Sequence, residues 1–258
     1  MEIGVIISLG LYFALMLAIG LFAYRNSEAN VEGYLLGGRQ LSPAVTALSA
    51  GASDMSGWML MGLPGAMYIS GMSAAWIGIG LVIGAWCNYK FVAPRLRSYT
   101  EVANNAITIP DYFAERFVDK SNLLRIISAI VIILFFTLYT SSGVVAGGKL
   151  FESSFGFDYT IGVFVTAGVV VAYTLFGGFM AVSLTDFVQG CIMFIALILV
   201  PTVVIFDLGG ITATINTVNA IDTNFFSLFT AVGSTESISI IAIISLMAWG
   251  LGYFGQPH

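Results

Sequence analysis

Seven long stretches of apolar residues dominate this chain of 258 residues. An α-helix needs about 20 apolar residues to cross the hydrocarbon core of a bilayer, which is about 30 Å thick. We therefore expect seven membrane-spanning helices, in the runs Ile3–Tyr24, Pro43–Ile69, Ala74–Ala93, Leu123–Lys149, Thr160–Phe176, Met180–Phe206 and Ile238–His258.

The low charge of the chain supports the same conclusion. Charged residues make up 9% of the sequence, whereas a typical soluble domain has about 25%. Much of the surface must therefore be apolar, and lipid is the solvent that suits it. Nine Lys and Arg residues are too few for a nucleic-acid-binding surface. The first run is too long for a secretion signal, and Glu2 rather than a cation precedes it. The predicted class is an all-α polytopic membrane protein.

The positions of Lys and Arg predict how the chain is oriented in the membrane. Only Lys149 falls on one side of the predicted spans. The other cations follow the first run or surround the loop after the third run: Arg25, Arg39, Lys90, Arg95, Arg97, Arg116, Lys120 and Arg125. We therefore expect the N-terminus outside the cell and the seventh run heading toward the cytoplasm.

Two connections are polar and are predicted to lie outside the membrane. They are Pro94–Asn122, in which Pro110-Asp111 favours the start of a short surface helix, and Asp207–Ser237. The seventh run ends in Gly255-Gln256-Pro257-His258 without a flanking cation. We expect the chain to be part of a longer protein whose second half is missing.

The second run has a polar centre, LSAGASDMSGW, from Leu48 to Trp58. A carboxylate such as Asp54 costs about 2.5–3.5 kcal/mol at the middle of a membrane helix, so it usually faces a cavity or a partner. The small Ser and Gly neighbours predict an unwound helix with exposed carbonyl and amide groups. Carbonyl oxygens and a carboxylate suit sodium, and the start of the second half-helix suits a substrate carboxylate. The alternative is a polar kink used only for packing.

The seventh run contains a second predicted interruption, WGLGYFGQP, with three glycines followed by Pro257. It lies five segments after the second run, so the two interrupted helices cross the membrane in opposite directions. Such a pair is the sequence sign of an inverted-repeat transporter with a site at the midplane. Trp249 and Tyr253 are four residues apart, so we expect them to share a helix face and to enclose a small apolar ring. Simple aromatic packing is the alternative.

Two further polar residues lie inside apolar runs. Tyr139 lies near the middle of the fourth run and precedes Thr140-Ser141-Ser142-Gly143, where small hydroxyl residues also serve helix–helix packing. Asp186 lies near the inner end of the sixth run, where it either assists ion release or is a solvated carboxylate at a helix start.

A resemblance to a known family becomes specific in the second run. The stretch LSAGASDMSGWMLMGLPG resembles the second helix of bacterial sodium/proline symporters in the sodium:solute symporter family. Gly37-Gly38-Arg39, Ile109–Phe113 and the terminal WGLGYFGQPH also match, and the similarity covers nearly the whole chain. The resemblance implies a LeuT-type inverted-repeat fold. Residues 1–42 are then an extra N-terminal helix and inner loop, 43–206 the first five-helix repeat, and 207–258 an outer loop and the start of the second repeat.

The resemblance also implies a function and a set of site residues. The chain would be the N-terminal half of a symporter that carries L-proline with sodium into the cell, across the lipid of the bacterial cytoplasmic membrane. Sodium would bind the backbone oxygens of Ala52 and Met55 near Asp54, with further ligands on the missing half. The implied substrate region is Ser56, Gly57, Tyr139, Trp249 and Tyr253, and the positions linked to the inner gate are Arg39 and Asp186.

Other functions remain as alternatives at this point. The solute of a related symporter is pantothenate, a sugar or a short carboxylate, and a transporter-like domain also occurs as the sensor of a signalling protein. A membrane enzyme is disfavoured because His258 is the sole histidine and no paired catalytic aspartates or metal motif is present. We expect no transport by this chain alone, because half of the cation site would be absent.

Overall fold

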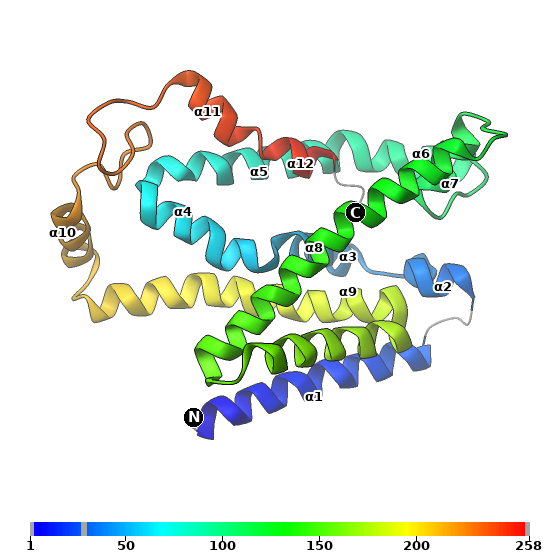
Figure 1. Cartoon of the computed structure of the whole chain (residues 1–258), viewed down its shortest axis with the longest axis horizontal. Helices are drawn as coiled ribbons and strands as arrows, with labels where there is room; N and C mark the ends of the chain where they lie inside the picture. The colour runs from blue at the N-terminus through cyan, green and yellow to red at the C-terminus, as the bar shows by residue number, and fades with distance from the viewer. Residues whose placement is uncertain (1–2, 27–29, 256–258) are drawn as a thin grey trace. The chain divides into compact units, whose positions relative to one another are not determined.

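The computed structural model describes residues 3–26 and 30–255, without the side chains of Val5, Met55, Ser56 and Leu60. These residues form helices joined by turns (Figure 1), with one isolated β-bridge between Thr230 and Ser237. The predicted all-α class is confirmed. Residues 256–258, the end of the seventh run, lie outside the described part.

The chain divides into two compact units, each made of two segments. The first unit comprises residues 1–56 and 106–193, and the second comprises 57–105 and 194–258. The first contains α1 (Ile3–Asn26), α2 (Val31–Leu36), α3 (Pro43–Gly57) without Gly57, α7 (Ile109–Arg116), α8 (Leu123–Phe155) and the first part of α9 (Tyr159–Asp207). The second contains α4 (Leu63–Ser70), α5 (Ala75–Cys87), α6 (Ala93–Val102), the end of α9, α10 (Ile211–Ile221), α11 (Ile240–Met247) and α12 (Gly250–Gly255).

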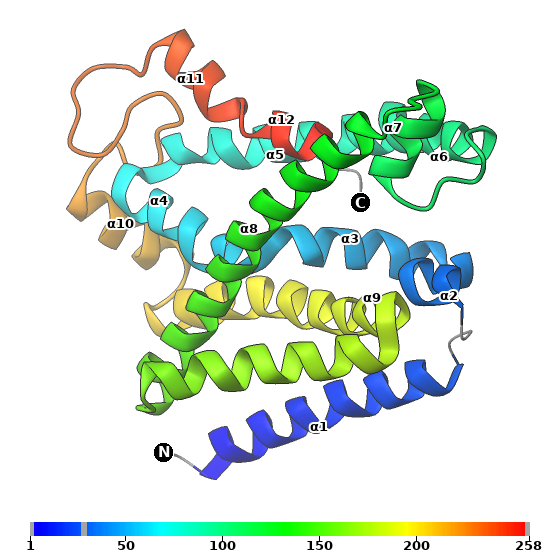
Figure 2. The same cartoon turned by 45° about the vertical axis from the view of Figure 1, so that its right-hand side comes forward.

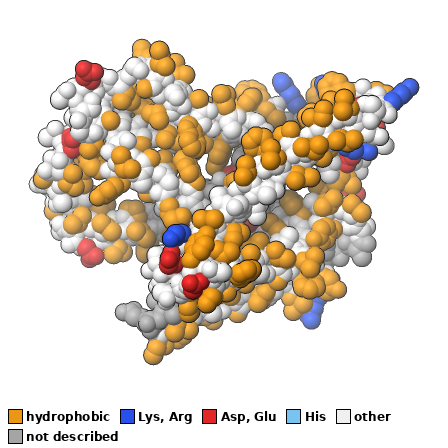
Figure 3. Space-filling model, in the orientation of Figure 1, with side chains coloured by type: hydrophobic (Ala, Val, Ile, Leu, Met, Phe, Trp, Pro, Cys, Tyr) orange, Lys and Arg blue, Asp and Glu red, His pale blue; other side chains and the backbone are white. Residues whose placement is uncertain are grey.

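Several helices have the length and composition needed to cross a membrane. Within the described residues there are four such stretches, at 6–26, 63–102, 123–155 and 159–207, and Ile240–Gly255 is a shorter apolar one. Hydrophobic side chains are spread over much of the face shown in Figure 3, and on α8 both Ile130 and Phe135 are about 60% exposed. An exposed apolar surface of this extent suits a lipid environment.

The helix α9 contains two of the predicted runs. Its helical conformation is interrupted at Gly178, with φ 55° and ψ −152°, and the chain reverses direction there (Figures 1 and 2). A β-carbon at Gly178 would lie 2.7 Å from the carbonyl oxygen of Tyr34, so both the backbone angle and the space require glycine. The predicted gap between the fifth and sixth runs is confirmed.

The polar connections contain more helix than the sequence suggested. The predicted short helix is present as α7, where the Thr108 hydroxyl accepts a hydrogen bond from the Asp111 amide at 3.3 Å and Pro110 lies in the first turn. However, α6 continues through the first residues of that connection, and α10 lies in the connection after α9. The sequence analysis named no helix at these two places, where the residues form helices that satisfy their backbone hydrogen bonds.

The N-terminal helix α1 packs against α9 within the first unit (Figure 2). Gln189 Nε2 donates a hydrogen bond to the Tyr12 hydroxyl at 2.7 Å, and Met16 is almost fully buried. At Gly20 a β-carbon would come within 3.0 Å of the Tyr173 β-carbon. Small residues let the two helices approach closely, as is common between helices in lipid.

Candidate functional site

The helix α3 carries half of the residues that the sequence singled out. Ala52, Asp54 and Gly57 are half-buried on it. The side chain of Ser56 lies outside the described part, and Met55 is described by its helical backbone only. The backbone is α-helical through all of them, and Gly57 has φ −62° and ψ −18°. The expected unwinding at this place is therefore wrong.

The irregularity in the second run lies one turn later. Residues Trp58–Gly62 form a π-helical turn, in which the Leu63 amide donates to the Trp58 carbonyl, five residues before it. Such turns widen a helix without breaking it, and they occur frequently at functional sites. At Gly62 a β-carbon would lie 2.6 Å from the Trp58 indole, so the glycine leaves room for that ring.

A hydrogen-bonded cluster explains why α3 stays regular despite its serines. The hydroxyls of Ser49 and Ser53 both donate to Oδ2 of Asp186 on α9, at 3.1 Å and 2.7 Å. Asp186 is 9% exposed, and hydrogen bonds to such a buried carboxylate contribute about 1.5–3 kcal/mol each. Because the two serines are four residues apart, they share one helix face. Their bonds to Asp186 hold α3 against α9 within the first unit.

Tyr139 joins the same cluster from α8. Its hydroxyl donates a hydrogen bond to the backbone carbonyl of Ser53. A carbonyl oxygen has two lone pairs, so it can accept this bond in addition to a helical one. The structure thus brings together Tyr139 and Asp186, two residues that the sequence had suggested separately, and links them through Ser53.

Ser49 and Ser53 were missed as site residues from the sequence. The signal that could have found them is their spacing of four on the face of the second run. One more polar atom lies close to Asp186 along α9. Ser183 is fully buried, and its hydroxyl has no hydrogen-bond partner among the described residues.

Arg39, predicted as a gate residue, has a partner close by in sequence. Its Nε lies 3.1 Å from a carboxylate oxygen of Glu32, and both side chains are partly exposed. Such a pair contributes about 0–1 kcal/mol. Arg39 itself has φ 56°, after Gly37 and Gly38 which have φ 60° each. The three left-handed residues form a tight turn that presents Arg39 beside α2.

In the second unit the seventh run is interrupted as predicted, but the break comes at the start of the predicted stretch, and its three glycines lie in the helix that follows. Helices α11 and α12 are separated by Ala248 and Trp249. The Leu251 and Gly252 amides donate to carbonyls three residues before them, at 2.9 Å and 3.1 Å. Trp249 therefore lies in the turn and Tyr253 in α12, so the expected shared face of one continuous helix is wrong.

Aromatic and backbone contacts anchor this interrupted segment. The Trp249 ring stacks on the Trp58 ring, with centroids 5.3 Å apart and planes inclined by 21°. The carbonyl of Tyr253 accepts a hydrogen bond from the Asn88 amide group at 2.9 Å. Trp249 and Tyr253 thus both contact residues from the other chain segment of the second unit, residues 57–105.

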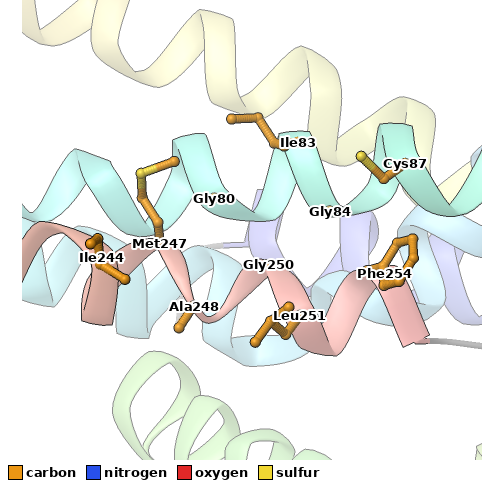
Figure 4. Close-up of a pocket in the computed structure, with 10 residues that line it drawn as sticks. All are labelled: Gly80, Ile83, Gly84, Cys87, Ile244, Met247, Ala248, Gly250, Leu251 and Phe254. Atoms are coloured by element: carbon orange, nitrogen blue, oxygen red, sulfur yellow. The ribbon is translucent and has the colours of Figure 1, made fainter.

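The close contact between α5 and α12 depends on glycines. A β-carbon at Gly84 would overlap the Gly250 carbonyl, and one at Gly250 would overlap the Gly80 carbonyl. Figure 4 shows these glycines where the two ribbons meet. An apolar cavity of about 490 Å³ lies along this contact, between residues such as Met247 and Phe254. Its lining offers no charged group and suits an apolar occupant.

Comparison with known proteins adds a decisive observation to this geometry. The family model described as "Sodium:solute symporter family" matches residues 34–258. The chain belongs to the sodium:solute symporter family. The family suggested by the second run is therefore confirmed, and the match includes residues of both units.

Several curated relatives are similar over almost the whole chain. An osmoregulated proline transporter of Bacillus subtilis is 58% identical over 258 residues, which are 100% of this chain and 51% of the relative. A high-affinity proline transporter of the same organism is 60% identical over 243 residues, 94% of this chain and 50% of the relative. A sodium/proline symporter of Staphylococcus aureus is 54% identical over 252 residues, 98% of this chain and 48% of the relative.

The chain thus spans about half the length of the curated relatives it matches. In this symporter-family chain, the candidate site residues of the first unit offer carbonyl, hydroxyl and carboxylate oxygens. Those of the second unit offer aromatic rings. Oxygen groups of this kind suit a hard monovalent cation and a polar solute, and rings suit the apolar part of a solute.

Proposed function

We propose that this chain forms the N-terminal half of a sodium-coupled symporter that imports L-proline across the bacterial cytoplasmic membrane. The observation that carries the proposal is its identity of 54–60% with relatives named as proline transporters or sodium/proline symporters, over 94–100% of this chain. Such identity exceeds what a shared fold alone requires.

The proposed architecture is the LeuT-type inverted repeat, with seven spans in this chain and the N-terminus outside. Two irregular places in the described structure support it. The second run widens at Trp58–Gly62, and the seventh run is interrupted between α11 and α12. Irregular backbone inside a membrane is tolerated where it lines a cavity or is buried in protein, and it marks binding sites in inverted-repeat transporters.

In this proposal sodium is a transported substrate that binds first from outside. The carbonyl oxygens of Ala52 and Met55 bind it, and the carboxylate of Asp54 offsets its charge. Further ligands come from the part of the transporter beyond this chain. Each carbonyl has a lone pair besides the one used in a helix, so α3 does not need to unwind to offer it.

Proline binds next to sodium in the proposed site. Ser56 and Gly57 contact its polar groups near the end of α3, and Tyr139 encloses this region from α8. Trp249 and Tyr253 face the apolar pyrrolidine ring, which suits aromatic side chains. Arg39 and Asp186 control release on the inner side.

The membrane potential adds to the driving force. Proline is a zwitterion without net charge, so one sodium ion per cycle carries one positive charge inward. A potential of 100 mV contributes about 2.3 kcal/mol for each charge moved. This coupling gives accumulation of proline against its gradient.

The test is uptake of radiolabelled proline by cells that lack other proline transporters and express the full-length transporter containing this chain. We expect uptake with sodium outside, little with choline in its place, and inhibition by unlabelled proline. Stronger inhibition by pantothenate, a sugar or a short carboxylate would assign another substrate. Absence of uptake for all of them, with the protein in the membrane, would favour a transporter-like sensor.

A further inference from the structure

Ser53 is held by two other helices through two different groups. Its hydroxyl donates to Asp186 Oδ2 on α9 at 2.7 Å, and its backbone carbonyl accepts the Tyr139 hydroxyl of α8. All three residues belong to the first unit. One residue of α3 therefore connects the tyrosine of the proposed proline region with the carboxylate of the proposed inner gate.

The bond to the Ser53 carbonyl also fixes the peptide that follows it. The carbonyl of Ser53 and the amide of Asp54 belong to one planar peptide unit. When the Tyr139 hydroxyl holds that carbonyl, it limits rotation of the peptide leading to Asp54. The neighbouring carbonyls of Ala52 and Met55 belong to the same helical turn, so their direction depends on the same restraint.

Ser49 offers a natural comparison on the same helix. It lies one turn before Ser53, is 7% exposed, and donates to the same Asp186 oxygen at a longer distance of 3.1 Å. It shares the bond to the carboxylate, but it lies outside the turn that contains Ala52, Asp54 and Met55. If substitution of Ser53 affects sodium dependence more than substitution of Ser49 does, the effect comes from the ion site and not from the general packing of α3 on α9.

We propose that Ser53 is a positioning residue that couples proline binding at Tyr139 to sodium binding on α3 and to Asp186. This inference rests on the proposed function and adds a residue to it. When proline orders Tyr139, the tyrosine hydroxyl holds the Ser53 carbonyl and the sodium-binding turn in place. The Ser53 hydroxyl transmits the same restraint to Asp186, so that ion and substrate occupy the site together.

The experiment compares sodium and proline dependence of uptake in four variants of the full-length transporter. Ser53→Ala removes the hydroxyl, and we expect the sodium concentration for half-maximal uptake to rise about tenfold, as for loss of one hydrogen bond to a charged group. Ser53→Thr keeps the hydroxyl and is expected to stay within about threefold of the unmodified transporter. Ser49→Ala, the matched control, is expected to change this sodium concentration less than Ser53→Ala.

The fourth variant, Tyr139→Phe, tests the coupling itself. We expect this variant to raise both the sodium and the proline concentration needed for half-maximal uptake. In the double variant with Ser53→Ala, the rise in the sodium concentration should be smaller than the product of the two single effects, because both substitutions break the same connection. A Ser53→Ala transporter with an unshifted sodium requirement, or effects that multiply fully, would overturn the proposal. If Ser53→Ala does not reach the membrane, an unchanged sodium requirement in Tyr139→Phe overturns it instead.

The unmodified transporter separates this inference from the proposed function. If proline uptake by the unmodified transporter does not depend on the sodium concentration, the proposed function is contradicted. Sodium-dependent uptake combined with an unshifted Ser53→Ala variant contradicts only the role of Ser53.

Discussion

The indole of Trp58 stacks on the indole of Trp249, with ring centroids 5.3 Å apart. Each of these residues lies at an irregular place in its own segment, Trp58 at the start of the π-helical turn and Trp249 between α11 and α12. The stack therefore joins the widened turn of the second run to the interruption of the seventh run inside one compact unit.

We expect the two indoles to give an exciton couplet in circular dichroism of the purified transporter. Trp58→Phe and Trp249→Phe should each abolish the couplet, because two nearby indoles are needed to produce it. Stacked aromatic pairs contribute about 0.5–1.5 kcal/mol beyond their buried area, so each variant should also lose a few degrees of thermal stability. Trp86→Phe is the control, since Trp86 is 55% exposed and contacts Phe91. A couplet that persists without Trp58 would contradict the stack.

The glycine contact between α5 and α12 predicts a sharp difference between two substitutions on one helix. Gly84→Ala would place a β-carbon on the Gly250 carbonyl, whereas at Gly78 no atom lies within 4 Å of a β-carbon. We expect Gly84→Ala to lower stability by about 1–3 kcal/mol, as for overpacking in a core, and Gly78→Ala to be nearly neutral. Thermal unfolding of the detergent-purified transporter measures both. Equal melting temperatures for the two variants would contradict the close approach.

Asp54→Ala is expected to abolish sodium-stimulated proline uptake in the full-length transporter. A unit charge about 4 Å from a cation contributes about 4 kcal/mol at an effective dielectric constant of 20, which corresponds to roughly 1,000-fold in affinity. The control is Glu101→Gln, which removes an exposed carboxylate paired with Arg97. Uptake measured over a range of sodium concentrations distinguishes the two. Normal sodium dependence after Asp54→Ala would refute the proposed ion site.

The loop after α10 should respond to acid through Asp222. Hydrogen bonds from the backbone amides of Asn224 and then Gly233 lower the pKa of this carboxyl group, and both bonds measure 2.7 Å. Because the folded pKa is lower than the unfolded one, the contribution is present above the ordinary value of about 4 and is lost as the pH falls through the lowered value.

Amide hydrogen exchange at Gly233 provides the measurement for this loop. We expect protection of this amide near neutral pH, and its loss at all pH values in Asp222→Asn, which keeps the size of the side chain but not its charge. Glu236→Gln, in the same loop, is the control and should keep the protection. Unchanged exchange in Asp222→Asn would show that the carboxylate does not order the loop.

Much of the helical framework could be predicted from the sequence because hydropathy and small residues act locally. The apolar runs located α1 and α8, and the gap between the fifth and sixth runs fell on Gly178. The pair Pro110-Asp111 located α7. Each of these features depends on residues within one or two helical turns.

The connections inside the candidate site could not be predicted in the same way. Ser53 and Asp186 are 133 positions apart, and their contact depends on how α3 packs against α9. The sequence also overestimated the effect of Ser and Gly on α3, because those serines find a partner that holds the helix. The widened turn at Trp58–Gly62 has no simple sequence signal. The orientation in the membrane and the transported solute remain predictions.

The reversal at Gly178 has a consequence for how the chain enters the membrane. A single glycine joins two long apolar arms, so no polar stretch is available there to pause in the aqueous phase. The arms are then expected to leave the translocation machinery as a pair, as a preformed hairpin. A reporter inserted in the loop after α10 should be tolerated. The same reporter inserted at Gly178 should prevent correct membrane insertion, because it would separate each arm from the arm that it packs against.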